Sequence, residues 1–229
     1  MTSSSNWGSE SLAVLWKDLL SEFRTRYSLS AVLLFSVTAL AVVSFSVSPY
    51  ALDPEAKAAF LWIVLFFSAM SGLSRSFVRE EETRTALALR LSASADAVYM
   101  GKLLFNIVLQ SAVAAIVVPL FLLLMDTRPA NPALLTAATA LGTLALASSS
   151  TIIAAIVSRA NAKGALFAVL AFPLSLPGLS SAIGATAKAL RGTMPEAGMG
   201  AVGDIRVLIA YSALMIAASL LLFDYVWNS

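Results

Sequence analysis

The sequence predicts an all-α integral membrane protein with six transmembrane helices and an amphipathic helix near its N-terminus. Apolar residues make up 59% of the 229 positions and charged residues only 12%, whereas a soluble domain carries about 25% charge to keep its surface hydrated. Six apolar runs each approach the roughly 20 residues that cross the hydrocarbon core as a helix. A backbone in lipid must satisfy its own hydrogen bonds, which favours helices, and the alternating pattern of a membrane barrel is absent.

Residues 10–27 are predicted to form the amphipathic helix. Apolar side chains recur along this segment at helical spacing, and charged side chains fill the other face. The apolar residues are Leu12, Leu15, Trp16, Leu19, Leu20, Phe23 and Tyr27, and the charged ones are Lys17, Asp18, Glu22 and Arg24. The segment is too short and too charged to cross the bilayer, so we expect it to lie in the cytoplasmic interface.

The apolar runs predict one transmembrane permease domain that comprises the whole chain. The spans are expected near residues 29–47, 58–74, 103–125, 133–157, 165–187 and 207–223. Ten lysines and arginines lie on the side of the chain ends and five on the other side, which places both termini in the cytoplasm. Tyr225 and Trp227 end the last span and are predicted to anchor it at the interface.

The fifth span is predicted to be broken. Pro173 and Pro177 fall near its middle, and proline removes a backbone donor and clashes with the preceding turn. Four glycines and one proline follow between residues 188 and 203. These signals favour a span that bends and re-enters as short helices on the outer side, although a single kinked helix followed by a loop also fits them.

The sequence contains no constellation that suits catalysis, metal binding or ion coupling. The chain has no cysteine and no histidine, which removes thiolate chemistry, the commonest general base and the usual axial ligand of haem iron. No charged side chain falls at mid-depth in a predicted span, and there is no P-loop motif for ATP. The net charge of +2 is spread over the span ends, which does not suggest a nucleic-acid partner. We therefore expect a non-catalytic membrane subunit that draws its energy from another chain.

Two polar residues stand out within the third span. Asn106 and Gln110 lie four residues apart near its cytoplasmic end. They can hydrogen-bond between helices or line a path through the membrane, and interhelical bonding is the favoured interpretation.

Residues 75–102 form the one sizeable hydrophilic segment, and the predicted topology places it in the cytoplasm. It carries five Lys or Arg and four Asp or Glu residues. After its acidic cluster, Leu87 and Leu91 are four residues apart and so share one side of a short helix. Such a helix can dock on the membrane surface or in the groove of a partner, and we favour a partner.

Three stretches of the chain carry a family resemblance. They are Lys17-Asp18 with Glu22 and Arg24-Thr25-Arg26, then Leu73-Ser74-Arg75-Ser76-Phe77 with Arg79-Glu80, and Tyr99-Met100-Gly101-Lys102-Leu103. With the six spans and the long segment after the second span, they resemble the haem exporter permease of cytochrome c maturation, the CcmB family. This family has the architecture of a type-2 ABC exporter permease. The chain departs from the family pattern after the acidic cluster, where Thr85-Ala86-Leu87-Ala88 replaces the usual Gly-x-Leu-Glu.

The resemblance implies that residues 75–102 form a coupling loop that fits a groove on a cytoplasmic P-loop ATPase. The other implied partners are a haem-handling membrane subunit with its own histidine ligands, a small membrane subunit, a periplasmic haem chaperone and a second copy of the chain. ATP and haem would be bound by the partner subunits and not by this chain. The residues that would transmit the ATPase motion are Glu80, Glu81, Glu82, Arg84, Leu87 and Leu91.

The implied function is to couple ATP hydrolysis to haem export, or to the release of the haem-loaded chaperone, in the bacterial inner membrane. A type-2 ABC permease for a drug, a lipid or a polysaccharide is a second interpretation, and a scaffold that only gathers other membrane subunits is a third. The acidic cluster alone does not separate them, because three carboxylates also stabilise a helix N-terminus without any partner.

Overall fold

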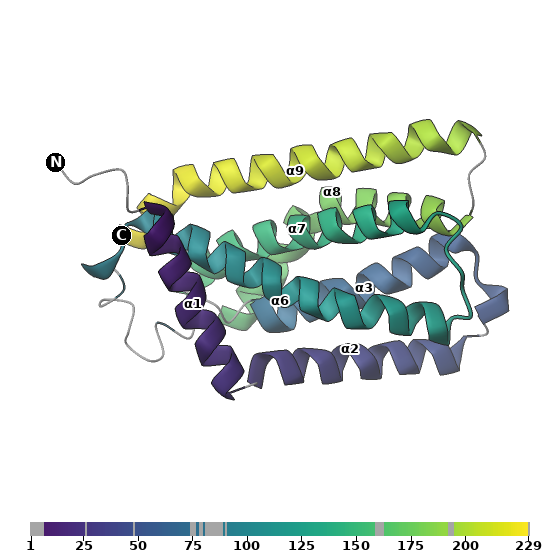
Figure 1. Cartoon of the computed structure of the whole chain (residues 1–229), viewed down its shortest axis with the longest axis horizontal. Coiled ribbons are helices and arrows are strands. Elements are labelled where there is room, and N and C mark those ends of the chain that lie inside the picture. Colours follow the sequence, from purple (N-terminus) through teal and green to yellow (C-terminus); the bar gives the residue numbers. More distant parts are fainter. Residues whose placement is uncertain are drawn as a thin grey trace.

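The structure, a computed structural model, describes residues 7–25, 27–47, 49–73, 77, 80, 89, 91–158, 163–191 and 195–228. Within these ranges the protein consists of seven α-helices and one 3-10 turn, with no β-strand. Figure 1 shows the long helices lying side by side, with a shorter helix crossing them at one end. The predicted all-α fold class is confirmed.

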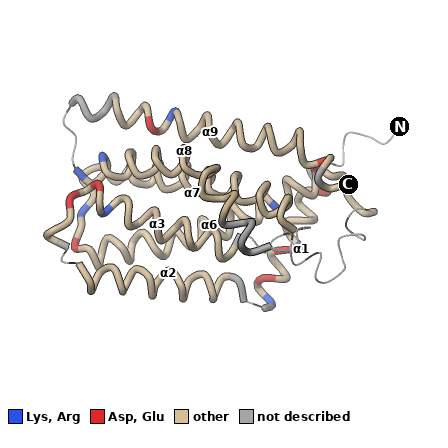
Figure 2. Tube along the Cα trace, turned by 180° about the vertical axis from the view of Figure 1, so that it is seen from behind, with Lys and Arg blue, Asp and Glu red and all other residues tan. Residues whose placement is uncertain are grey.

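Six of the helices are long and apolar enough to cross a membrane,. They are α2 (Tyr27–Ser46), α3 (Pro54–Leu73), α6 (Ala95–Leu124), α7 (Pro132–Val157), α8 (Lys163–Arg191) and α9 (Pro195–Asn228). Each overlaps one of the predicted spans. Charged residues gather toward the two ends of this bundle, and the length between them is almost free of charge (Figure 2). The chain is therefore a multi-pass membrane protein.

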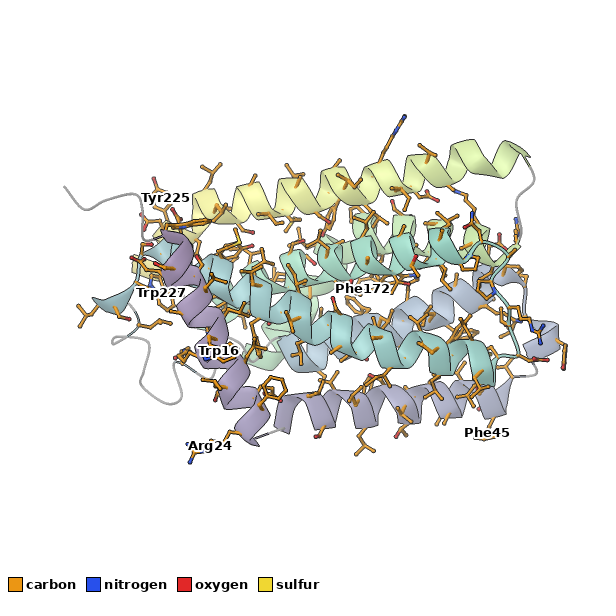
Figure 3. The ribbon with its side chains drawn as sticks, viewed as in Figure 1. Trp16, Arg24, Phe45, Phe172, Tyr225 and Trp227 are labelled. Atoms are coloured by element: carbon orange, nitrogen blue, oxygen red, sulfur yellow. The ribbon has the colours of Figure 1, made fainter. Side chains whose placement is uncertain are left out.

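The short helix α1 (Trp7–Thr25) crosses the bundle at the end where α6 begins (Figure 1). Its face away from the bundle exposes a row of apolar side chains, namely Leu12, Trp16, Leu20 and Phe23, which are between 53 and 71% exposed. An apolar row on a helix that crosses the end of a membrane bundle fits the lipid interface, as expected for the amphipathic helix. Phe45, at the far end of α2, is similarly exposed along the bundle side (Figure 3).

Helix α7 forms the centre of the bundle. In its span 78% of the residues are buried, against 17% in the span of α2. Gly142 of α7 gives room for the fully buried ring of Trp62, since a Cβ at this glycine would lie only 2.0 Å from the ring. The Trp62 indole N–H then donates a 2.9 Å hydrogen bond to the hydroxyl of Thr186. One aromatic side chain of α3 thereby ties together α7 and α8.

The prediction that the fifth span is broken and re-enters is wrong. Helix α8 runs without interruption through both Pro173 and Pro177, and residues 195–203, expected to belong to short re-entrant helices, are the first turns of α9. In lipid, a backbone carbonyl that has lost its helical hydrogen bond finds no water to replace it. A proline-containing helix that packs against its neighbours therefore costs less free energy than an unwound segment. Helix α9 contacts this stretch, because the Tyr211 hydroxyl donates a 2.7 Å hydrogen bond to the carbonyl oxygen of Leu174, between the two prolines.

Polar contacts between helices close the end of the bundle opposite α1. Arg191 of α8 pairs with Glu55 of α3, and Lys188 of α8 pairs with Asp204 of α9. The 3-10 turn η1 (Pro49–Ala51) also lies at this end and joins α2 to α3. Each of these charged side chains at the end of a span therefore has a counter-ion on a neighbouring helix.

Candidate functional site

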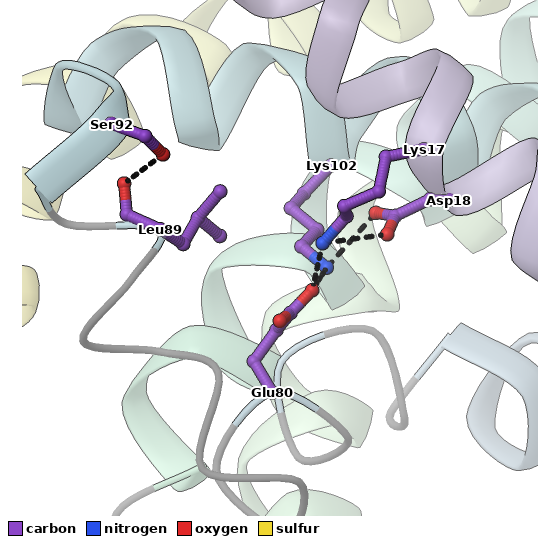
Figure 4. Close-up of polar contacts among 6 residues, drawn as sticks. All are labelled: Lys17, Asp18, Glu80, Leu89, Ser92 and Lys102. Carbon is purple, nitrogen blue, oxygen red and sulfur yellow. Dashed lines mark hydrogen bonds and ion pairs between the residues drawn. The ribbon is translucent and has the colours of Figure 1, made fainter.

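A group of four charged side chains lies under α1, and we call it the charged cluster (Figure 4). It consists of Lys17 and Asp18 of α1, Glu80 of the segment between α3 and α6, and Lys102 of α6. The Lys102 Nζ lies 2.9 Å from Oδ2 of Asp18 and 2.8 Å from Oε1 of Glu80. Lys17 pairs with the same Glu80 oxygen, and its Nζ lies 3.2 Å from Oδ1 of Asp18. Two cations and two carboxylates thus neutralise one another.

The charged cluster is largely removed from solvent. The side chain of Lys102 is 2% exposed and that of Glu80 is 8% exposed, whereas Lys17 is 46% exposed. Removing one member of a buried ion pair leaves an uncompensated charge, which costs about 3–5 kcal/mol. Burial lowers the pKa of Lys17, but the negative charges of Asp18 and Glu80 outweigh this effect, and that pKa lies above its ordinary value. Lys17 therefore remains a cation at neutral pH.

A close approach of α1 to α6 brings the charged cluster together. A Cβ at Gly101 would lie 2.6 Å from the Cβ of Val14 and 2.8 Å from the carbonyl oxygen of Ser11, so glycine allows the two helices to touch. Val14 and Asp18 are four residues apart and share one side of α1. Contact at Gly101 consequently places Asp18 beside Lys102, the next residue of α6.

An aromatic cluster lies next to the charged cluster and consists of Phe77, Tyr99, Phe223 and Trp227. The ring of Phe77 is 1% exposed and lies 5.6 Å from the ring of Phe223 and 6.1 Å from that of Trp227, centroid to centroid. Lys102 Nζ is 5.8 Å from the centre of the Phe77 ring. The prediction that Trp227 anchors the last span at the interface is wrong, because Trp227 is buried in this cluster, while Tyr225 is 78% exposed (Figure 3).

Phe77 and Glu80 give the segment between α3 and α6 two points of attachment. They are three residues apart, Phe77 contacts Lys102 of α6 and packs on α9, and Glu80 pairs with α1 and α6. Lys102 contacts both residues. This one segment is thereby tied to three helices.

The structure describes two of the six residues that the sequence assigned to coupling. Glu80 lies inside the protein and not on an open surface, whereas Leu91 is 83% exposed just before α6. Leu89, in contrast, is buried, and the Ser92 hydroxyl donates a 3.2 Å hydrogen bond to its carbonyl oxygen (Figure 4). The remaining four residues, Glu81, Glu82, Arg84 and Leu87, lie outside the described residues.

Sequence reasoning did not assign a role to Lys17, Asp18, Phe77 or Lys102. Each belongs to a stretch that carried the family resemblance, but the resemblance gave no partner for any of them. The available signal was Lys102, a lone cation at the start of an apolar span. A charge in that position needs an anionic partner, although the sequence does not say which.

Asn106 and Gln110 are both fully buried and bond to other helices. The Asn106 side-chain amide donates a 2.8 Å hydrogen bond to Thr151 of α7, and that of Gln110 donates a 3.1 Å hydrogen bond to the carbonyl oxygen of Leu65 in α3. Of the two interpretations left open, these contacts fit bonding between helices. Within the described residues, no three His, Cys, Asp or Glu side chains group as a metal site would require,.

Comparison with known proteins places the whole arrangement in one family. The family model described as CcmB protein matches residues 9–224, which include nearly all of α1, the charged cluster, the aromatic cluster except Trp227, and at least part of every span. The curated proteins contain no match to the chain. The chain therefore belongs to the CcmB family, the membrane permease subunits of ABC-type haem exporters.

Proposed function

We propose that this chain couples ATP hydrolysis by a separate P-loop ATPase to haem export, or to the release of a haem-loaded periplasmic chaperone. In this proposal it lies in the bacterial inner membrane with both termini in the cytoplasm, and the ATPase docks on the segment between α3 and α6. A haem-handling membrane subunit, a small membrane subunit and a second copy of the chain complete the assembly. The chain itself binds neither ATP nor haem and catalyses no reaction.

The attachment of the α3–α6 segment through Phe77 and Glu80 is the observation that carries this proposal. Packed interiors deform little, so a displaced segment moves the elements to which it is tied. Here those elements are α1, the start of α6 and the end of α9. A displacement of this segment by the ATPase would therefore be transmitted to the membrane-embedded part through three helices.

Leu91 supports the docking part of the proposal. It is 83% exposed on the same segment, in a region that also contains the buried Leu89. An exposed leucine beside the start of α6 is suited to a hydrophobic groove on a partner. Because this side chain makes no contribution to the core, its role can be tested without disturbing the fold.

The experiment is co-purification of the ATPase with the tagged chain from detergent-solubilised membranes, followed by an ATPase assay of the eluate. We expect Leu91→Asp to lower the amount of bound ATPase, and Tyr50→Ala, at the opposite end of the bundle, to leave it unchanged. Glu80→Gln is expected to keep the ATPase bound but to reduce cytochrome c maturation. Glu55→Gln, which removes a carboxylate from the exposed pair with Arg191, serves as its control.

Two outcomes would contradict the proposal. Absence of any co-purifying ATPase would exclude the docking site, and unchanged maturation in a stably folded Glu80→Gln protein would exclude coupling through the charged cluster. The second result, with the ATPase still bound, would favour the scaffold interpretation. Haem absorbance in the eluate separates a haem exporter from a permease for another substrate.

A further inference from the structure

A groove that shares no residue with the charged cluster opens between α1, α2 and α6. Its volume is about 400 Å³. Its walls are apolar side chains of all three helices, chiefly Phe23, Leu29, Leu33, Phe105 and Val108. Phe23 is 71% exposed and Val108 is 45% exposed, so these two residues form its open edge. The groove therefore faces the lipid along the side of the bundle.

A single carboxylate lines this apolar groove. Glu22 is 8% exposed, and its Oε1 accepts a 2.8 Å hydrogen bond from the backbone N–H of Leu29, in the first turn of α2. Among the described residues Glu22 has no cationic partner. A buried carboxylate in an apolar setting is costly unless a cation or further donors reach it. The groove thus contains a negative charge that is suited to a bound cation.

The groove is polar at one end and apolar along its length. Glu22 lies at the corner between α1 and α2, and Ser30 also lines the wall near this corner. From there α2 and α6 run in the same direction into the bundle (Figure 1), past Leu33 and Ala112. Arg24 lies exposed at the same end of α1 (Figure 3). A carboxylate at one end of an apolar channel suits an amphiphile with a cationic head group.

We propose that the groove binds one phosphatidylethanolamine molecule of the leaflet on the α1 side. Its acyl chain lies between α2 and α6, and its ammonium group pairs with Glu22. The charges favour this lipid, because phosphatidylglycerol would bring a phosphate next to Glu22 without supplying a cation. This site is independent of the proposed coupling function, since it involves neither the charged cluster nor the ATPase.

The test is native mass spectrometry of the delipidated full chain in mild detergent, with phosphatidylethanolamine or phosphatidylglycerol added at equal concentration. We expect the wild type to retain the ethanolamine lipid about tenfold better, the scale of one charge-assisted hydrogen bond. Glu22→Gln keeps an acceptor for the Leu29 N–H and should abolish the preference. Glu10→Gln, on the same helix but outside the groove, should preserve it. Ala112→Phe, which fills the apolar length, should reduce binding of both lipids.

The proposal is overturned if the wild type shows no preference, if Glu22→Gln keeps it, or if Ala112→Phe retains both lipids. The chain has no native cysteine, so Ala112→Cys provides a single cross-linking position in intact membranes. A cross-link to another subunit would show that a protein fills the groove and would also overturn the proposal. All these readouts are independent of ATPase activity, so they separate the lipid site from the coupling function.

Discussion

At the scale of single residues, the sharpest contrast is between two lysines that both form ion pairs. Lys102 is 2% exposed and is shared by Asp18 and Glu80, while Lys188 is 31% exposed and, among the described residues, pairs with Asp204. Partly exposed pairs contribute little because water already solvates both charges. Only the buried pairs are expected to control stability.

Replacement of Lys102 by methionine tests this contrast. We expect Lys102→Met to lower the free energy of unfolding in detergent by about 3–5 kcal/mol, because Asp18 and Glu80 lose their buried counter-ion. The matched change Lys188→Met should stay within about 1 kcal/mol of the wild type. Chemical denaturation of the three proteins provides the measurement, and similar losses in both variants would contradict the burial argument.

Lys17 predicts a pH dependence of stability in the alkaline range. Its pKa in the folded protein is raised, relative to about 10.4 in an unfolded chain. Because the pKa is higher in the folded state, the protonated side chain stabilises the fold fully at pH values below its unfolded-state pKa. This contribution is lost as the pH rises through the folded-state pKa. We expect the unfolding temperature to fall above about pH 10, and to fall less in Lys17→Arg, whose side chain stays charged. Identical alkaline profiles of the two proteins would contradict this assignment.

At the scale of elements, the contact between α1 and α6 depends on Gly101. A methyl group at this position would lie within 3 Å of Val14 and Ser11, and any separation of the helices would also lengthen the pairs of Lys102. No other amino acid at position 101 would allow α1 to lie so close to α6, because every amino acid except glycine has a Cβ atom. The glycine therefore decides the position of the interfacial helix.

Gly101→Ala is expected to destabilise the protein by about 1–3 kcal/mol, the usual cost of an overpacked contact. The control is Gly203→Ala in α9, where a Cβ would meet no atom within 4 Å, and where alanine should be neutral or stabilise the helix by up to about 1 kcal/mol. Thermal unfolding in detergent compares the two variants. A Gly101→Ala protein as stable as the wild type would show that α1 can shift without loss.

The existence of the six spans could be predicted, but several of their ends could not. The third span was expected to begin at residue 103, yet α6 begins at Ala95 and includes Lys102. The last was expected from residue 207, yet α9 begins at Pro195 and includes Asp204. In both cases a charged residue ended the apolar run in the sequence, while in the structure a partner on another helix neutralises that charge. Such partners are distant in the sequence.

At the scale of the whole molecule, the even number of spans places α1 and the end of α9 at the same end of the bundle (Figure 1). The excess of lysine and arginine predicts that this end is cytoplasmic. Leu91 lies at this end and Tyr50 lies in the turn between α2 and α3 at the other, and the two side chains are 83% and 85% exposed. They are therefore suitable reporters of orientation.

Single-cysteine labelling in the naturally cysteine-free chain measures the orientation directly. In intact spheroplasts, a membrane-impermeant maleimide should label Tyr50→Cys and leave Leu91→Cys unlabelled, because only the outer end is accessible. Lysis should make Leu91→Cys reactive as well. The opposite pattern would place the segment between α3 and α6 outside the cytoplasm and would contradict the proposed ATPase contact.

The sequence by itself determined the membrane class, the number of spans, the amphipathic helix near the N-terminus and the family. Each of these depends on local composition or on spacing along a helix, which every apolar run carries independently of its neighbours. Only the tertiary structure decided that α8 is continuous, that Trp227 is buried, and that Glu80 lies between Lys17 and Lys102. These features depend on which residues meet in space, because a charge, a proline or an aromatic ring in a membrane is stabilised by partners on other helices.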